Sequence, residues 1–426
     1  MKKVALALLL LCRTCVFSQT KIVPLSNGDL AQPLNTAISS CSSTLGCDLE
    51  IVPFSRAVLL NSVVIINKSN VTIHCDTSAQ ISTNYSSTPF NSTYSYWYGV
   101  FDVSAANNVE ISGCSFNVTS LGTTAVDTIH VWGSQNVKIH NDSITSSVAP
   151  VYPSMLGIRA EGSSALPSVN VKAFGNVITV PSIGLSVGDN GQHVDYYENT
   201  VTNSFQCFDF NGSGGGSNPD AYDIDFHNNS CNSDYSSNYV ESAADVRIRN
   251  NTFWQDASSG QPVVNVHNTS TANNELHIDI SGNLFQGGAT SAYAAHFFQN
   301  ANHWTFSHNR VRNMKNDGLL IDSTSGSPIF GEIVGNQFVD NGQAGPSGNY
   351  CGIRLHQSMG NNVGYLTIST NQFVDDQGAH TELYPACSDG GQAPFYLKYT
   401  DNQNHLANQQ NLPVGCSTCL ISGNFP

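Results

Sequence analysis

Acidic, basic and aromatic residues recur at one outward position of a repeated strand, and this row is where chemistry is expected. The row comprises one residue per repeat: His130, Arg159, Ser186, Asp209, Glu241, Asn265, His296, Leu320, Arg354 and Lys398. A second row, two positions further along each strand, comprises Trp132, Glu161, Asn211, His267, Phe298, Asp322 and His356. Aromatic rings among carboxylates and guanidinium groups suit the apolar faces and polar rims of sugars. The rows therefore predict a groove for a linear polysaccharide, and the alternative is a mixed polar surface.

Two kinds of glycosidic-bond cleavage are open to these residues. A lyase needs a base and a cation that stabilises the enolate, roles that Arg159, Lys398 and His130 could fill. A hydrolase needs two carboxyl groups with different pKa values. The predicted catalytic residues are Asp127, His130, Arg159, Asp209 and Glu241. The predicted substrate-binding residues are Trp132, Glu161, His267, His296, Arg354 and His356.

The sequence offers Ca²⁺ as its one candidate cofactor. Asp209 and Glu241 could together hold Ca²⁺, which takes oxygen ligands. Asp220, Asp223 and Asp225 are spaced like calcium ligands, but Asp223 and Asp225 share a face with Arg247, which favours an ion pair. No other cofactor is expected.

These rows depend on a repeat that fixes the fold. One phrase recurs along the chain: a polar residue, then alternating apolar positions, then Gly/Asn-Asn, then a final apolar residue. Examples are Asn136-VKIHNDSI and Asp245-VRIRNNTF. The Asn-like position falls at 114, 142, 176, 199, 229, 251, 283, 309, 336 and 371. Repeats of this length with strand periodicity indicate a solenoid. We expect the Asn to adopt a left-handed bend and to bond to its equivalent one coil above.

The predicted fold is all-β: a single-domain right-handed parallel β-helix of about a dozen coils with an N-terminal capping helix. A second strand precedes each phrase, and residues 211–221 and 376–395 are expected to be loops. An outward ladder in the phrase is expected to form salt bridges rather than a binding strip: Glu110, Lys138, Lys172, Asp195, Asp225, Arg247, Asp279, Thr305 and Glu332. Apolar residues at helical spacing after Asp29, the expected N-cap, predict the capping helix.

The expected organisation has four parts. Residues 1–18 form a signal peptide with Lys2, Lys3 and a short apolar core, cleaved after Ser18. Residues 19–50 carry the capping helix, 51–401 form the β-helix, and 402–426 form a C-terminal cap with the last repeat. We therefore expect a secreted protein, extracellular or periplasmic.

Cysteine usage agrees with export. Ten cysteines follow the predicted signal peptide and form five sequential pairs, expected to be disulfides: Cys41/Cys47, Cys75/Cys114, Cys207/Cys231, Cys351/Cys387 and Cys416/Cys419. The chain has 31 acidic and 16 basic residues, a formal net charge of −15. This charge argues against nucleic acid and anionic membranes as partners, and no later segment is long and apolar enough to span a bilayer.

The repeats resemble those of the right-handed β-helix superfamily of pectate lyases, polygalacturonases and their relatives. The segment Gly28–Cys75 looks like the N-terminal region of pectate-lyase-like proteins. The stretch Val126-DTIHVWGSQNVKI is similar to the polygalacturonase pattern N-T-D-G-I-x-V-x-x-S-x-N-V-x-I, which implies that Asp127 matches that family's first catalytic aspartate. The next repeat, Met155-LGIR, departs from the pattern at the family's paired aspartates, and no Gly-His-Gly follows. The resemblance therefore implies the fold and argues against an ordinary polygalacturonase.

Two functions are thus expected. The first is a secreted protein that cleaves a polysaccharide, as a lyase or a hydrolase, in a groove along the stacked strands. The second is a non-catalytic β-helix, a surface adhesin or glycan-binding rod.

Overall fold

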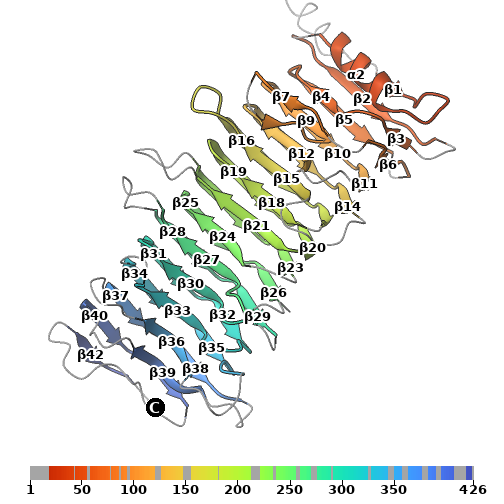
Figure 1. The fold of residues 1–426 in the computed structure, drawn as a ribbon. Coiled ribbons are helices and arrows are strands. Elements are labelled where there is room, and N and C mark those ends of the chain that lie inside the picture. Colours follow the sequence, from red (N-terminus) through yellow and green to blue (C-terminus); the bar gives the residue numbers. More distant parts are fainter. Residues whose placement is uncertain are drawn as a thin grey trace, which may run out of the picture.

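The computed structural model describes residues 19–424 except 43, 55–57, 77, 86–87, 94–95, 120–125, 147–154, 181, 213–220, 234–236, 256–259, 270–275, 289–290, 325–327, 344–349, 357–362, 377–381, 390–394 and 407–418. The chain winds into an elongated solenoid, with α2 at its N-terminal end and β42 at the other (Figure 1). The predicted signal peptide lies outside the described residues.

Three parallel sheets form the walls. Sheet 1 contains β1 (Thr20–Ile22), β2 (Cys47–Ile51), β5 (Val71–Cys75), β10 (Asn107–Ser112), β13 (Gln135–His140), β16 (Ser168–Phe174), β19 (Gly191–Tyr197), β22 (Tyr222–His227), β25 (Ala244–Arg249), β28 (Ile278–Ser281), β31 (Asn302–Ser307), β34 (Ile329–Val334), β37 (Gly364–Ser369), β40 (Phe395–Thr400) and β42 (Leu420–Ser422).

Sheet 2 contains β3 (Val58–Leu60), β6 (Gln80–Thr83), β11 (Ser115–Val118), β14 (Ser143–Ser146), β17 (Val177–Thr179), β20 (Thr200–Ser204), β23 (Ser230–Ser233), β26 (Thr252–Gln255), β29 (Leu284–Gly287), β32 (Arg310–Arg312), β35 (Gln337–Val339), β38 (Gln372–Val374) and β41 (Gln403–His405).

Sheet 3 contains β4 (Val64–Ile66), β9 (Phe101–Ser104), β12 (Val126–Trp132), β15 (Met155–Glu161), β18 (Ile183–Val187), β21 (Gln206–Asn211), β24 (Asn238–Glu241), β27 (Val264–His267), β30 (Ala295–Phe298), β33 (Leu319–Asp322), β36 (Tyr350–His356) and β39 (Glu382–Asp389). A short antiparallel hairpin, β7 (Phe90–Asn91) and β8 (Tyr96–Trp97), lies outside these sheets.

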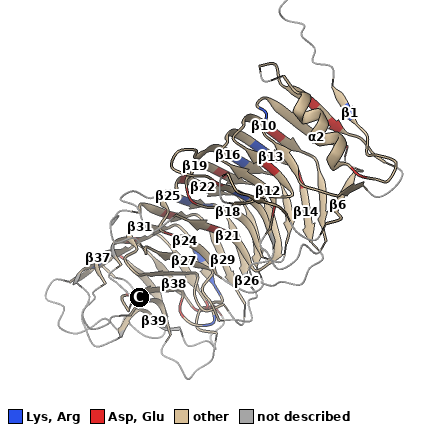
Figure 2. Cartoon of the chain, turned by 45° about the horizontal axis from the view of Figure 1, so that its top comes forward, with Lys and Arg blue, Asp and Glu red and all other residues tan. Residues whose placement is uncertain are grey.

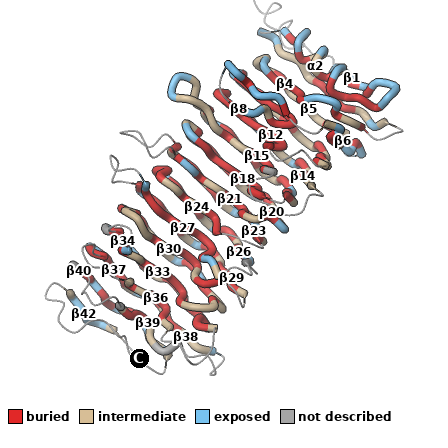
Figure 3. The backbone as a smooth tube through the Cα atoms, viewed as in Figure 1, coloured by how far each residue is buried: buried red, intermediate tan, exposed pale blue. Residues whose placement is uncertain are grey.

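The parallel β-helix predicted from the repeat is confirmed. Alternation places one set of side chains in the core: Val137 and Ile139 are buried, while Lys138 between them is exposed. Each strand pairs in parallel with its equivalent one coil away, as Val109, Val137 and Val171 do on successive coils. Buried residues therefore run through every coil (Figure 3), and equivalent outward residues stack in columns about 4.8 Å apart.

The predicted asparagine ladder is also present. Asn251 Nδ2 donates to Asn283 Oδ1 at 3.0 Å and to the Phe226 carbonyl at 2.9 Å, and its Oδ1 accepts from Asn229. The left-handed conformation, however, belongs to the preceding residue, such as Asn250 with a φ of 56°. The prediction that the ladder Asn itself is left-handed is wrong, because its amide must point into the coil to reach the ladder bonds.

One loop prediction is also wrong. The segment 376–395 contains β39, which pairs with β36 in sheet 3. The strand Glu382-LYPACSD lacks a clear alternation and contains Pro385, so its pattern did not reveal it. Consequently β40 belongs to sheet 1, although its sequence was assigned to the other strand of the coil.

The capping helix is α2 (Ala31–Ser40), which buries Leu34 and Ile38 at the N-terminal end. Asp29 lies one position before the N-cap residue, and its Oδ1 accepts the N–H of Ala31 at 3.1 Å. None of the described helices is long and apolar enough to cross a membrane.

Four of the five predicted disulfides are formed: Cys41–Cys47, Cys75–Cys114, Cys207–Cys231 and Cys351–Cys387. The fifth predicted pair, Cys416/Cys419, is not among these four. Cys419, next to β42, is partly buried against the core and is itself disulfide-bonded. Cys416 lies outside the described residues, so the pairing of Cys419 with Cys416 stays a prediction.

The charged ladder of sheet 1 forms ion pairs along part of its length, as expected. Acidic and basic residues both occur along this part of the sheet, from β10 to β25 (Figure 2). Lys172 contacts Asp195 at 3.2 Å, Arg247 donates to Asp223, and Arg249 donates to Asp225. These pairs occupy the carboxylates proposed for calcium, so the structure favours an ion-pair ladder there. Asp220 lies outside the described residues.

Candidate active site

A cluster of ionisable side chains lies on the outward face of sheet 3, toward the N-terminal end of the solenoid. His130 on β12 stands in register with Asp102 on β9 and Arg159 on β15, and Trp132 stands in register with Glu161. Parallel pairing thus brings residues about 28 positions apart in sequence to within about 5 Å.

The four charged residues form a chain of alternating sign. His130 Nδ1 lies 3.1 Å from Asp102 Oδ2, and its Nε2 lies 3.1 Å from Glu161 Oε1. Glu161 in turn pairs with the Arg159 guanidinium. The Asp102 and His130 side chains are buried, whereas Glu161 is 15% exposed and Arg159 is 34% exposed. The chain therefore runs from the interior to the surface.

Asp102 is held by three donors. Tyr96 OH donates to its Oδ1 at 3.0 Å, Ser104 Oγ donates to the same oxygen at 2.6 Å, and the Gly99 N–H donates to Oδ2 at 3.1 Å. Tyr96 comes from the hairpin strand β8 and stacks on Trp132, with ring centroids 5.0 Å apart. The hairpin thereby covers the buried end of the cluster and fixes the acceptor of His130.

Asp127 joins the cluster from the start of β12. Its Oδ2 lies 3.9 Å from His130 Nε2, the nitrogen that Glu161 also contacts. Because Asp127 Oδ2 and Glu161 Oε1 lie 3.9 Å and 3.1 Å from the same nitrogen, these two oxygens are at most 7.0 Å apart. Burial raises the pKa of Asp127, opposed by His130 and Arg159.

The remaining groups have contrasting electrostatics. Burial would lower the pKa of His130, but hydrogen bonds to Asp102 and Glu161 raise it to about 10. Burial would raise the pKa of Glu161, but Arg159 and His130 lower it to about 2. Burial also opposes the charge of Arg159, and the carboxylates of Glu161, Asp127 and Asp209 outweigh that effect and raise its pKa. At neutral pH, His130 and Arg159 are therefore cations and Glu161 is an anion.

Asp209 lies two coils beyond Arg159 in the same column. Burial raises its pKa to about 6, with Arg159 opposing the shift and Glu241 adding to it. Asp209 can therefore exchange a proton near neutral pH, unlike Glu161.

The repeat alignment predicts that Glu241 lies in the same outward column as Asp209, and this prediction is wrong. It pairs with Asn211 and His267, in the row of Trp132 and Glu161, and Tyr239 is the residue in register with Asp209. The error has a simple cause: β24 is short, and its outward positions carry both Tyr239 and Glu241. Asp209 and Glu241 thus occupy different columns, which separates the predicted calcium ligands. Among the described residues, no group of three His, Cys, Asp or Glu is arranged to hold a metal ion.

The other predicted residues form a second cluster further along sheet 3. His267 and His296 both stack on Phe298, with centroid distances of 4.7 Å and 4.4 Å. Burial lowers the pKa of His267, with the Glu241 carboxylate opposing. Arg354 donates to the buried Asp317 at 2.7 Å. His356 is in register with Asp322 at the edge of this cluster.

Lys398 does not belong to either cluster. It lies on β40 in sheet 1, paired with Thr367 and Leu420. Its assignment to the catalytic row is wrong because β39, not β40, supplies the last strand of sheet 3.

Sequence reasoning missed Asp102, Ser104 and Tyr96. The signal for Asp102 was available: Phe101-DVS alternates as a strand and precedes Asn107 as the other second strands precede their phrases. Tyr96 gave no such signal, because it reaches the cluster from a hairpin outside the repeat.

No protein-family model and no curated protein matches the sequence. Solved structures do match over most of the chain. The catalytic domain of Agl-KA is 12% identical, with a TM-score of 0.65, over 89% of this chain and 68% of that one. The alginate lyase AlyF-OU02, in complex with G6, is 11% identical, with a TM-score of 0.57, over 96% and 88%. PfbA, a surface adhesin of Streptococcus pneumoniae, is 12% identical, with a TM-score of 0.54, over 76% and 91%.

These similarities establish the fold. The chain has the pectate-lyase-like right-handed parallel β-helix, as the repeats implied. Enzymes that act on polysaccharides and a surface adhesin both have this fold, so function must be argued from the site.

Proposed function

We propose that the protein is a secreted enzyme that hydrolyses glycosidic bonds of a polysaccharide bound along sheet 3. The observation that carries the proposal is the convergence of Asp127 and Glu161 on one nitrogen of His130, within 7.0 Å of each other. Glycoside hydrolysis uses two neighbouring carboxyl groups whose surroundings shift their pKa values in opposite directions, as burial raises that of Asp127 and Arg159 lowers that of Glu161.

Each residue has a role that follows from its surroundings. Burial raises the pKa of Asp127 and so favours its protonated form, which donates the proton to the glycosidic oxygen as the bond breaks. Glu161 stays ionised beside Arg159 and acts on the opposite side, either on a water molecule or on the anomeric carbon. His130 and Asp102 do not touch the sugar; they hold the two carboxyl groups in position.

Elimination is less well supported by these contacts. A lyase needs a cation that is available to the sugar carboxylate, and Arg159 is engaged by Glu161. The nearest titratable base, His130, is buried and protonated. The site therefore has an anion beside a carboxyl group whose protonated form is favoured by burial, whereas its cations are already paired.

The test is an activity assay with purified protein and a panel of plant, algal and bacterial polysaccharides. New reducing ends without absorbance near 235 nm support hydrolysis, and rising absorbance would show elimination instead. Asp127→Asn and Glu161→Gln should each lower kcat at least about 100-fold, the typical contribution of acid–base catalysis. Glu110→Gln, a carboxylate of the ladder on sheet 1, is the matched control and should keep full activity.

A non-catalytic surface protein is the second candidate. The burial of Asp102 and His130 favours it, because a buried ion-pair network also perturbs pKa values for structural reasons alone. This candidate predicts that Asp127→Asn and Glu161→Gln change thermal stability in a protein that cleaves no polysaccharide of the panel.

Export is part of the proposal. The four disulfides suit an oxidising compartment. Expression with the native leader, followed by N-terminal sequencing of the mature protein, should give Gln19 as the first residue. Retention of Met1 in the cytoplasm would contradict export.

A further inference from the structure

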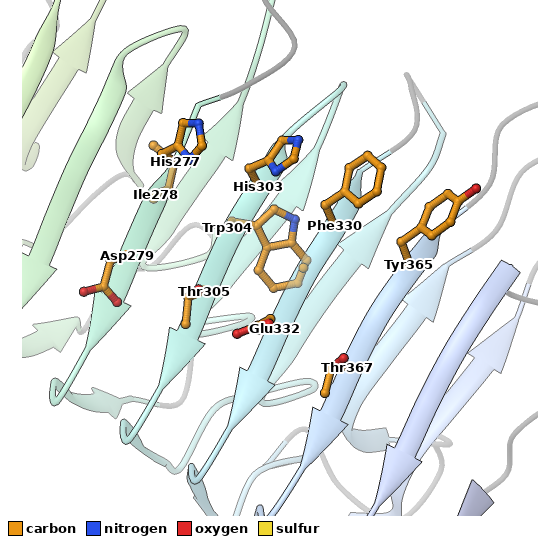
Figure 4. A pocket seen from close by; sticks show the side chains of 11 residues that line it. His277, Ile278, Asp279, His303, Trp304, Thr305, Phe330, Glu332, Tyr365 and Thr367 are labelled. Atoms are coloured by element: carbon orange, nitrogen blue, oxygen red, sulfur yellow. The ribbon is translucent and has the colours of Figure 1, made fainter. Parts of the chain in front are cut away.

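A second groove lies on sheet 1, in the C-terminal half of the solenoid and on a different sheet from the cluster around His130. Its cavity volume is about 510 Å³. Two rows of side chains form its walls, from β28 and the residue before it and from β31, β34 and β37, as Figure 4 shows. One wall contains the rings of His277, His303, Phe330 and Tyr365, and the other contains Asp279, Thr305, Glu332 and Thr367.

The ring wall is a continuous stack. Phe330 lies 4.7 Å from the His303 ring and 4.8 Å from the Tyr365 ring, and Tyr396 extends the stack at 4.9 Å. Phe330, Tyr365 and Tyr396 are 42%, 43% and 47% exposed. Three neighbouring rings with this exposure form one contiguous patch, unlike apolar residues scattered singly over a surface.

The backbone at this column disfavours aromatic residues. Its members are left-handed, with φ values of 56° at Phe330, 51° at Tyr365 and 52° at Tyr396. Nearer the N-terminus the same column carries Asn, Asp and His, which tolerate this conformation: Asn70, Asn108, Asn136, Asn170, His193, Asp223, Asp245, His277 and His303. Bulky residues are rarely left-handed, because the Cβ then lies too close to the following carbonyl oxygen. The three aromatic residues therefore stand where Asn would be the more stable choice.

Aromatic rings can stack on sheet 1 and stabilise it without occupying the left-handed column. A second ring column on sheet 1 joins His140, Phe174, Tyr197 and His227 at 4.6–5.2 Å, without left-handed backbone. Its histidines are tied to carboxylates, His140 to Glu110 and His227 to Asp195, each at 3.1 Å. This column has the contacts of a structural ladder, and it provides a control for the groove.

The opposite wall supplies hydrogen-bond acceptors. Asp279 and Glu332 offer carboxylate oxygens, and Thr305 and Thr367 offer hydroxyl groups. Among the described residues that line this groove there is no Lys or Arg. An apolar row beside an acceptor row suits the C–H and hydroxyl groups of a sugar. The lining itself carries two carboxylates and no cation, which disfavours a polyanion, while Arg247 and Lys398 stand in register with Asp279 and Thr367 one coil beyond either end.

We propose that this groove is a second binding site, which takes an uncharged polysaccharide chain lying along the solenoid axis. From His277 to Tyr396 the ring wall crosses four coil spacings, about 19 Å at about 4.8 Å each. That length accommodates several sugar units of one chain. The site holds the polysaccharide without cleaving it, and it does not depend on the catalytic role of Glu161.

The test compares two pairs of substitutions to asparagine. Phe330→Asn with Tyr365→Asn restores the residue type found elsewhere in the left-handed column, so thermal stability should be unchanged or higher. Phe174→Asn with Tyr197→Asn is the matched control in the structural column, and it should lower stability while leaving binding intact. All variants carry Glu161→Gln to suppress cleavage during the assay.

Binding is measured by affinity electrophoresis in gels containing xylan, mixed-linkage β-glucan, galactomannan or starch, with alginate, pectate and poly-lysine as charged comparators. The expected result is retardation by at least one neutral polysaccharide, with Kd raised at least tenfold in Phe330→Asn/Tyr365→Asn. Retardation by no neutral polysaccharide, or only by poly-lysine or the polyuronates, would overturn the proposal. Undiminished binding by the groove variant would overturn it too, as would a large loss of its stability, which would make the rings structural.

Discussion

Asp142 occupies a ladder position that asparagine fills in the later coils, and its replacement by asparagine should stabilise the protein. Asp142 Oδ1 accepts the N–H of Cys114 at 2.7 Å, but Oδ2 is buried without a hydrogen-bond partner. In the next coil, Asn176 Nδ2 donates to the Ile139 carbonyl at 3.1 Å and to Asn199 Oδ1 at 2.9 Å. Asp142→Asn would supply the two equivalent donors.

The magnitude follows from those two bonds. A net gain of about 1 kcal/mol per hydrogen bond gives about 2 kcal/mol at neutral pH, or about 2–4 °C in Tm. Burial raises the pKa of Asp142 well above its usual value. Wild-type stability therefore falls as pH rises from the unfolded pKa near 3.9 toward the folded pKa. The gain in Asp142→Asn should be smallest near pH 4 and larger above it.

The assay is a set of thermal melts by calorimetry or circular dichroism between pH 4 and pH 8. Asn176→Asp is the mirror-image control, because it introduces the same carboxyl group one coil later and removes both amide donors. It should lose at least about 2 kcal/mol at neutral pH and less at pH 4. An unchanged or lower Tm for Asp142→Asn at pH 7 would refute the ladder reasoning.

Three further outcomes are expected. Asp102→Asn removes one of the two carboxylates that hydrogen-bond to the buried His130 cation and should cost about 3 kcal/mol. The stability that the wild-type network provides below pH 6.5 is lost as pH rises toward 10, and melts from pH 6 to pH 10 should show that loss at lower pH in the variant. Asn251→Ala removes both ladder donors and the acceptor for Asn229 and should cost about 3 kcal/mol or more by urea denaturation, so a neutral result would contradict the ladder's role. Gly331→Ala places a Cβ 2.1 Å from Trp304 Cζ2 and should lower the free energy of unfolding in urea by about 1–3 kcal/mol, whereas wild-type stability would mean that the indole can move freely.

The sequence was sufficient for the fold because a solenoid is specified coil by coil. Each phrase, such as Asp245-VRIRNNTF, carries its own alternation and its own ladder residue, so local patterns determine which side chains point outward. Columns of outward residues follow directly, and His130, Arg159 and Asp209 were aligned correctly on that basis. Four sequential cysteine pairs were likewise predictable, since neighbouring coils bring such pairs together.

The contacts of the site could be found only from the tertiary structure wherever a segment departs from the repeat. Asp127 Oδ2 lies 3.9 Å from His130 Nε2 although three positions separate the residues on β12, a spacing that places side chains on opposite faces of a regular strand. Tyr96 reaches Asp102 from a hairpin outside the coils, and β39 displaces Lys398 from sheet 3. Alternation predicts which face a residue occupies within a regular strand. The partners, burial and protonation states at a site depend on irregular segments from other coils, whose positions are set by packing rather than by the repeat.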